Sequence, residues 1–218
     1  MITSVIRTQV ASFLGDPDQT RFSGAAYLSA INRAQEQLAL DTKALWKDKS
    51  WTHAASDADE DLPTDFMWED WVTYGGLKLI PISRYELLQL SGDDWTDDGA
   101  ALPTHFLIDP EQAVKEIVLY PIPTEAKTLV MRYFPLPTEL TADGDTPLNS
   151  SSLMAQFHIG LAAYAAWLML LSEELTPAII LKRRELAPIY ADAVTKAVDT
   201  MKNTASAGLK FKGKAIWS

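Results

Sequence analysis

Three apolar, proline-containing phrases decide the fold: Leu62-Pro63-Thr64-Asp65-Phe66, Val118-Leu119-Tyr120-Pro121-Ile122-Pro123 and Arg132-Tyr133-Phe134-Pro135-Leu136-Pro137. They belong to the stretch from Pro63 to Leu140. Proline fixes its own φ angle and pushes the preceding residue toward extended geometry, so a strand that ends in such a phrase stops abruptly and turns. The pattern before and after this stretch is helical. The chain is therefore expected to form an α+β fold that runs from helices into a small β unit and back into helices.

Several segments of the β unit have the composition of short strands. Gly75-Gly76 is a strong turn signal, and Leu129, Met131 and Tyr133 alternate with more polar positions, so one face of the last strand should be buried. Strands about ten residues apart indicate a small antiparallel sheet or sandwich. We expect strands at 51–55, 66–74, 77–82, 105–108, 114–120 and 128–134, helical turns at 84–90, and loops at 56–61 and 91–100.

The residues before the β unit predict two helices joined by a short turn, which is an αα-hairpin. The first covers residues 3–14, and the second begins after Ser23 and continues to about residue 46. Apolar positions of the second helix recur at helical spacing: Tyr27, Ile31, Ala34, Leu38 and Leu45. Polar residues are expected to cover its other side: Arg33, Gln35, Glu36 and Lys43.

Two further helices are expected after the β unit and a polar loop at 141–152. Residues 153–174 are apolar nearly all round, as in a central buried helix. Thr176-Pro177 fits the N-cap and first position of a last helix that ends near residue 201, which Pro188 should kink or split. The four helices should form one bundle with the β unit inserted. The expected divisions are 1–48, 49–150, 151–203 and a partner-binding tail at 204–218.

Composition restricts the class of protein. The chain has 218 residues, no cysteine and a net charge of −10. Residues 1–201 carry −14, since four lysines and no acid follow Asp199, and such a body should repel nucleic acid. The longest uncharged apolar run, residues 159–171, is too short to cross a bilayer and suits a buried helix. We therefore expect no membrane partner and synthesis in the cytoplasm.

No catalytic or cofactor-binding pattern is found in the sequence. His53, His105 and His158 are isolated, and His158 is expected to be packed and hydrogen-bonded inside a helix. Adjacent acids could serve a metal or glycosidase site, but solvated loops and helix ends have the same pattern. These pairs are Glu69-Asp70, Asp93-Asp94, Asp97-Asp98 and Glu173-Glu174. We expect no enzyme activity, no metal and no cofactor.

Tryptophans and the C-terminus are the candidate binding residues. Trp68, Trp71 and Trp95 could form a sugar-stacking platform, or they could belong to the core or to a subunit or tail interface. Residues 208–218 alternate apolar and basic side chains and end in Ile-Trp. They either order on a partner, form a free end, or form a strand that packs on the chain's own domain. The predicted contact residues are Leu209, Lys210, Phe211, Lys212, Lys214, Ile216 and Trp217.

The order of these phrases resembles that of the head-to-tail adaptor (connector) proteins of tailed bacteriophages. The resemblance covers nearly the whole chain and depends on the order and spacing of short motifs. Beside Leu62-Pro63-Thr64-Asp65-Phe66, the motifs are Ala34-Gln35-Glu36, Pro103-Thr104-x-Phe106, Val118-Leu119-Tyr120-Pro121-x-Pro123, Arg132-Tyr133-x-Pro135-x-Pro137-x-x-Leu140 and Tyr164-Ala165-Ala166.

This resemblance implies a structural protein of the virion. Adaptors form a ring, commonly of twelve copies, beneath the portal protein, and they extend the DNA channel and present a platform for tail or tail-tube proteins. Their C-terminal segment typically docks on the portal, which assigns residues 208–218 to portal binding. DNA would pass through the lumen without specific binding. The alternatives are a carbohydrate-binding or hydrolytic accessory protein that uses the Trp cluster and acid pairs, and a cytoplasmic interaction module.

Overall fold

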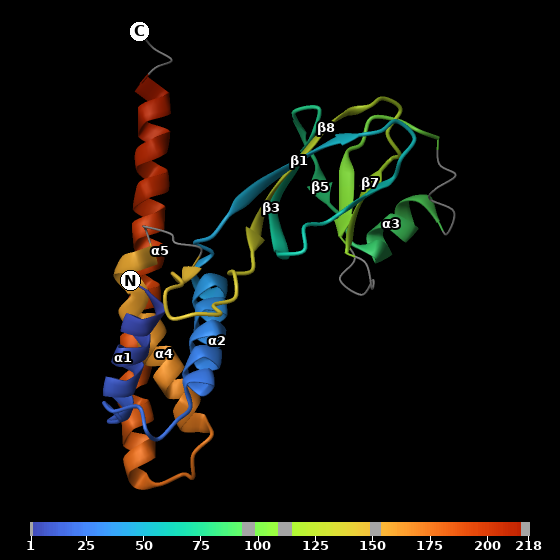
Figure 1. The fold of residues 1–218 in the computed structure, drawn as a ribbon. Helices are drawn as coiled ribbons and strands as arrows, with labels where there is room; N and C mark the ends of the chain where they lie inside the picture. Colours follow the sequence, from blue (N-terminus) through green and yellow to red (C-terminus); the bar gives the residue numbers. More distant parts are fainter. Residues whose placement is uncertain (1, 93–98, 109–114, 149–153, 215–218) are drawn as a thin grey trace. The chain divides into compact units, whose positions relative to one another are not determined.

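The computed structural model describes residues 2–92, 99–108, 115–148 and 154–214, with side chains as far as Asn203. The chain forms two compact units (Figure 1). One comprises Met1–Leu45 with Leu136–Ser218 and is helical, and the other is Trp46–Pro135 and is built mainly from strands. The predicted order of helices, β unit and helices is confirmed, and the fold is α+β.

The helical unit is a bundle whose members meet in one apolar core. Its elements are α1 (Thr3–Leu14), α2 (Gly24–Thr42), the 3-10 turn η3 (Met154–Phe157), α4 (His158–Leu171) and α5 (Pro177–Lys214). Gly15 ends α1 in the left-handed conformation, and the Ser23 side chain accepts a hydrogen bond from the Ala26 amide at the start of α2. The two caps produce the predicted αα-hairpin.

The central helix of the bundle is α4, as its composition predicted. It contacts α1, α2 and α5 and buries nine of its fourteen residues. The segment Met154–Leu171 is apolar and long enough to cross a membrane, but 61% of it is buried inside the protein, as in a core helix. Regular α-helix begins later and ends earlier than expected, because residues 154–157 form a 3-10 turn and the helix ends at Leu171.

The last helix, α5, begins directly after Thr176. The Thr176 hydroxyl acts as its N-cap and accepts a hydrogen bond from the Ile179 amide. Pro188 does not split it, and the helix continues to Lys214. Proline removes the hydrogen bond to the carbonyl of Arg184, and both residues are exposed, so water can satisfy that carbonyl. The expectation that the helix ends near residue 201 is therefore wrong by about thirteen residues.

Gln35 was expected on the exposed polar side of α2, and this expectation is wrong. The residue is only 1% exposed. Its amide nitrogen donates to the Thr138 carbonyl at 2.9 Å, and its carbonyl oxygen accepts from the Leu148 amide at 3.1 Å. On the preceding turn, Asn32 exchanges two hydrogen bonds with the backbone of Leu140. These amides tie the chain that follows the β unit to α2.

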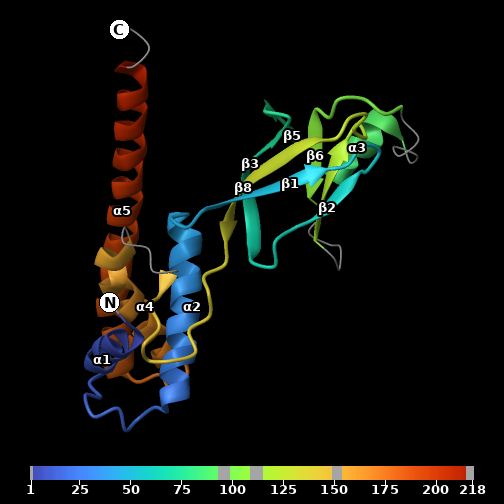
Figure 2. The same cartoon turned by 45° about the horizontal axis from the view of Figure 1, so that its top comes forward.

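The β unit is a sandwich of two four-stranded sheets. The first has the order β1-β8-β3-β4 and is antiparallel, whereas the second has the order β2-β7-β6-β5 and contains one parallel pair, β5 with β6. The strands are β1 (Lys47–His53), β2 (Asp59–Asp61), β3 (Phe66–Tyr74), β4 (Leu77–Lys78), β5 (Ile80–Pro81), β6 (His105–Ile108), β7 (Glu116–Tyr120) and β8 (Lys127–Pro135). Figure 2 shows β1, β8 and β3 side by side.

Alternate residues of the strands fill the space between the sheets. Leu129, Met131 and Tyr133 of β8 are buried there, as their spacing predicted. The helix α3 (Arg84–Ser91) starts with a capping box between Ser83 and Glu86, and its Leu87 forms a small second cluster with Ile82 and Leu107.

Three strand predictions were wrong in detail. The first strand covers Lys47–His53 where 51–55 was expected, and α2 before it ends at Thr42 and not near residue 46. Residues 59–61 form β2 where a loop was expected, because they pair with β7 although their acidic side chains have low strand propensity. The expected strand at 77–82 is divided at Leu79. Leu77 pairs in the first sheet and Ile80 in the second, so the buried Leu79 marks the point where the chain changes sheets.

Candidate interaction surfaces

Ionisable residues form no candidate metal centre in the part of the chain that the structure describes. His53 is buried, with Nδ1 3.0 Å from a Glu60 carboxylate oxygen and Nε2 3.0 Å from the Asp57 carbonyl. His105 contacts the adjacent Thr104 hydroxyl. Of the acid pairs, Glu173 forms an ion pair with Arg21, while Asp93-Asp94 and Asp97-Asp98 lie outside the described residues.

His158 is buried at the start of α4 and is only 1% exposed. Neither ring nitrogen has a hydrogen-bond partner among the described residues, so the expectation of a hydrogen-bonded histidine is wrong. Burial, with a smaller contribution from the positive N-terminus, lowers the pKa of His158 to about 4. The imidazole is therefore neutral at pH 7 and acts as a packing group.

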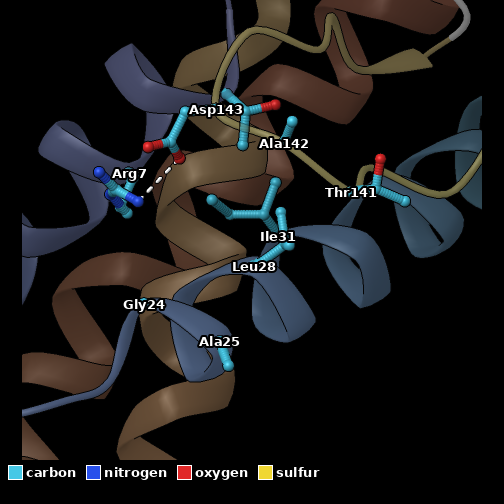
Figure 3. Close-up of a pocket in the computed structure, with 9 residues that line it drawn as sticks. Arg7, Gly24, Ala25, Leu28, Ile31, Thr141, Ala142 and Asp143 are labelled. Atoms are coloured by element: carbon cyan, nitrogen blue, oxygen red, sulfur yellow. Dashed lines mark hydrogen bonds and ion pairs between the residues drawn. The ribbon is translucent and has the colours of Figure 1, made fainter.

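A surface groove lies between α1, α2 and the loop at 141–143 (Figure 3). Its volume is about 330 Å³, and Arg7 donates a hydrogen bond of 2.7 Å to Asp143 at its edge. The lining is otherwise small or aliphatic: Thr3, Gly24, Ala25, Leu28, Ile31, Thr141 and Ala142. The ion pair occupies the charged groups of the groove, and the remaining lining offers neither a nucleophile nor a set of metal ligands.

Trp71 belongs to an ordered cluster on the outward face of the first sheet. The Arg132 guanidinium lies 5.2 Å from the Trp71 ring centroid and 4.5 Å from that of Trp46. Asp48 accepts two hydrogen bonds from Arg132, at 2.8 and 3.0 Å, and this bonding lowers the pKa of Asp48. Trp46 is 58% exposed. The guanidinium is thus held between two indoles and clamped by a carboxylate.

Trp68 lies on the same face, next to the Arg132 cluster. Its ring centroid is 5.8 Å from that of Phe134, two residues beyond Arg132 on the same strand. A register shift between Glu69 and Trp71 brings both tryptophans to one face although they are three residues apart. Trp95 lies outside the described residues. Trp68 and Trp71 therefore lie against neighbouring side chains of the same chain.

The predicted portal-binding segment begins on α5. Leu209, Lys210, Phe211, Lys212 and Lys214 belong to the helix, whereas Ile216 and Trp217 lie outside the described residues. Among the residues of α5 whose side chains the structure describes, Met201 is the last that packs against the core. From there the helix continues for thirteen residues, or about 20 Å at 1.5 Å per residue. Figure 1 shows this part of α5 beyond the ends of α1, α2 and α4.

Charge is divided unequally between the two units. Trp46–Pro135 contains seven Lys or Arg and seventeen Asp or Glu residues, which gives −10, while the helical unit contains twelve of each and is neutral. The sequence total of −10 thus comes from the β unit alone. In the helical unit the basic residues are concentrated on α5, which also holds the last four lysines of the chain.

We compared the sequence with models of known protein families. The family model described as SU10 adaptor protein matches residues 2–209. The chain belongs to this family. The match extends through both units and most of α5, and it confirms the resemblance to phage head-to-tail adaptors that the motif order indicated. No curated protein matches the sequence.

Membership in this adaptor family identifies the protein as a structural component of the virion that interacts with other head or tail proteins.

Sequence reasoning found Trp68 and Trp71 but missed their partners Trp46, Arg132 and Asp48. Arg132 stands opposite both Asp48 and Trp71 in the strand register, so a correct pairing of β1, β8 and β3 was the signal that could have found them.

Proposed function

We propose that this adaptor forms a ring of twelve copies beneath the portal protein. The ring extends the DNA channel and provides the platform on which tail or tail-tube proteins dock. Family membership supports a role between head and tail, and the extension of α5 beyond the helical core is the single observation that favours portal docking. The protein is made in the host cytoplasm and acts in the virion.

The portal-binding segment of the proposal is residues 208–218. The described backbone is helical as far as Lys214, so the alternation of apolar and basic residues does not form a strand in this structure. Gly208 and Gly213 weaken a helix by about 1 kcal/mol each relative to alanine, so contact with a partner would stabilise this part of α5. Its lysines suit an acidic portal surface.

The outward face of the first sheet is the proposed subunit or tail interface. Trp68 and Trp71 lie there beside Arg132, and tryptophan and arginine are the residue types that dominate binding energy at interfaces. The Asp48 clamp holds the guanidinium in place before a partner arrives, which reduces the entropy lost on binding. Trp95 is the third tryptophan that we assign to a subunit or tail interface.

DNA passage fits the charge of the chain. Phosphate groups are attracted by clustered cations, and the β unit has ten more acids than bases. We propose that such a surface lets DNA slide through the ring without adhering.

The test is binding to the portal protein from the same genome, by co-sedimentation and electron microscopy of the pellet. We expect a ring that caps the portal in fixed stoichiometry. Deletion of residues 208–218 should leave the fold intact and abolish binding. A Lys196→Ala variant is the control, since Lys196 lies earlier on α5 and pairs with Asp192.

Two outcomes would contradict the proposal at different points. Equal portal binding by the truncated protein would remove the assignment of residues 208–218 while leaving the adaptor role. If the full-length protein failed to bind a folded portal over a range of salt concentrations, the docking itself would be wrong.

A further inference from the structure

A groove between α4 and the start of α5 has a lining that fits one kind of partner. Trp167, Ile180 and Ala187 form its apolar part, and Arg183 and Arg184 form its charged part. Its volume is about 280 Å³. This is below the roughly 300–1,000 Å³ of pockets for small molecules, so the groove suits a single large side chain.

The two arginines of this groove have charge available for a partner. The Arg183 guanidinium lies 5.3 Å from the Trp167 ring centroid, and Arg184 is exposed. Neither forms an ion pair within the part of the chain that the structure describes, in contrast to Arg7 with Asp143 and Arg21 with Glu173. Stacking on Trp167 orients Arg183 without neutralising it.

Exposed aliphatic residues lie at the end of α4, in the connection to α5 and at the start of α5, the segments that carry the groove. Leu175 is 66% exposed, Leu181 59%, and Leu171 and Ile180 are also exposed. Two cations beside an exposed apolar surface indicate a protein partner with carboxylates and a bulky apolar group. Nucleic acid offers phosphates but would leave the aliphatic side chains in water.

The chain itself contains a segment with this chemistry. Residues 93–98 read Asp-Asp-Trp-Thr-Asp-Asp, which places four carboxylates around Trp95. Their structure lies outside the described residues, and the flanking Gly92 and Gly99 are exposed. The segment belongs to the β unit, whose net charge is −10, and the groove belongs to the neutral helical unit.

We propose that residues 93–98 of one copy dock in the α4–α5 groove of a neighbouring copy. Trp95 is the apolar anchor, and Asp94 and Asp97 pair with Arg183 and Arg184. The proposal rests on ring formation under the proposed function and assigns the contact between copies. A ring of identical chains needs two different patches that complement each other, and the groove and the acidic segment form such a pair.

Photo-crosslinking tests where Trp95 lies. The full chain with Trp95→p-benzoylphenylalanine is assembled on the portal from an equal mixture of ¹⁵N-labelled and unlabelled copies. We expect mass spectrometry to find crosslinks between copies, into residues 167–187. Crosslinks confined to one copy, or directed elsewhere, would overturn the proposal. If the adaptor does not bind the portal, the same reaction on the free, concentrated protein tests the contact independently.

Charge reversal tests the ion pairs. Arg183→Glu with Arg184→Glu should weaken association between copies at least about tenfold, as should Asp94→Arg with Asp97→Arg. A mixture of the two variants should restore it, because each groove then meets a segment of opposite charge. Arg33→Glu and Asp57→Arg, which reverse exposed charges elsewhere in each unit, serve as controls. Rings that cap the portal normally with either double variant would overturn this contact and leave the proposed function standing.

Discussion

Gly160 of α4 packs directly against Ala193 of α5. A Cβ atom built on Gly160 would lie 2.3 Å from the Cβ of Ala193, closer than such atoms approach in proteins. The helix axes can come this close only because one position lacks a side chain. The neighbouring Ala162, Ala163, Ala165 and Ala166 are also fully buried, so α4 presents small side chains on several sides.

Gly160→Ala should therefore destabilise the helical unit. Overpacking of a core typically costs about 1–3 kcal/mol, and the better helix propensity of alanine offsets up to about 1 kcal/mol of this. Urea unfolding followed by circular dichroism at 222 nm measures the difference. Gly144→Ala is the matched control, since a Cβ there meets no atom within 4 Å. Equal stability of the two variants would contradict the close contact.

Gln35→Leu should destabilise the same unit for a different reason. Leucine has a similar size but cannot accept the hydrogen bond from the Leu148 amide or donate to the Thr138 carbonyl. Leaving buried polar groups unpaired costs about 1–3 kcal/mol each. The comparison variant is Gln37→Leu, whose side chain bonds only to exposed Asp41 among the described residues. Hydrogen exchange of the Leu148 amide should rise in Gln35→Leu alone, and unchanged protection there would count against this role.

Arg132→Lys should loosen the outward face of the β unit. Lysine keeps the charge but loses the bidentate bond to Asp48 and the stacking on Trp46 and Trp71. We expect a loss of about 1 kcal/mol in stability, the size of one or two exposed cation–π contacts. Near-ultraviolet circular dichroism should also weaken as the indoles lose their fixed surroundings. The control is Arg33→Lys, at an exposed position of α2, which should change neither the stability nor the near-ultraviolet signal.

Two of the positions that sequence reasoning missed share a physical cause. Periodicity predicted α2 well, yet position 35 stands four residues after Ile31 on the buried face, and only its polar identity led to the expectation of exposure. Three consecutive acids at 59–61 form β2 because β7 supplies a partner, which no local pattern shows. The length of α5 was missed because Gly208 and Gly213 are poor helix formers. At position 35 and at residues 59–61 a tertiary contact outweighed local propensity.

His158 makes the stability of the helical unit depend on pH. Its pKa is about 4 in the folded protein, because burial disfavours the charged imidazole, and 6.5 is the ordinary value. Between these values the unfolded chain binds a proton that the folded chain does not, so stability is complete above pH 6.5 and falls as the pH drops toward 4. The whole effect is at most about 3 kcal/mol, at 1.36 kcal/mol per pH unit.

His158→Phe keeps a buried ring and removes the titration, so the free energy of unfolding should fall less between pH 7 and pH 4.5 than in the parent protein. Urea unfolding at a series of pH values measures this, with His105→Gln as a comparison at a partly exposed histidine. If parent and His158→Phe lost stability in parallel, the imidazole would already be accessible to protons in the folded protein.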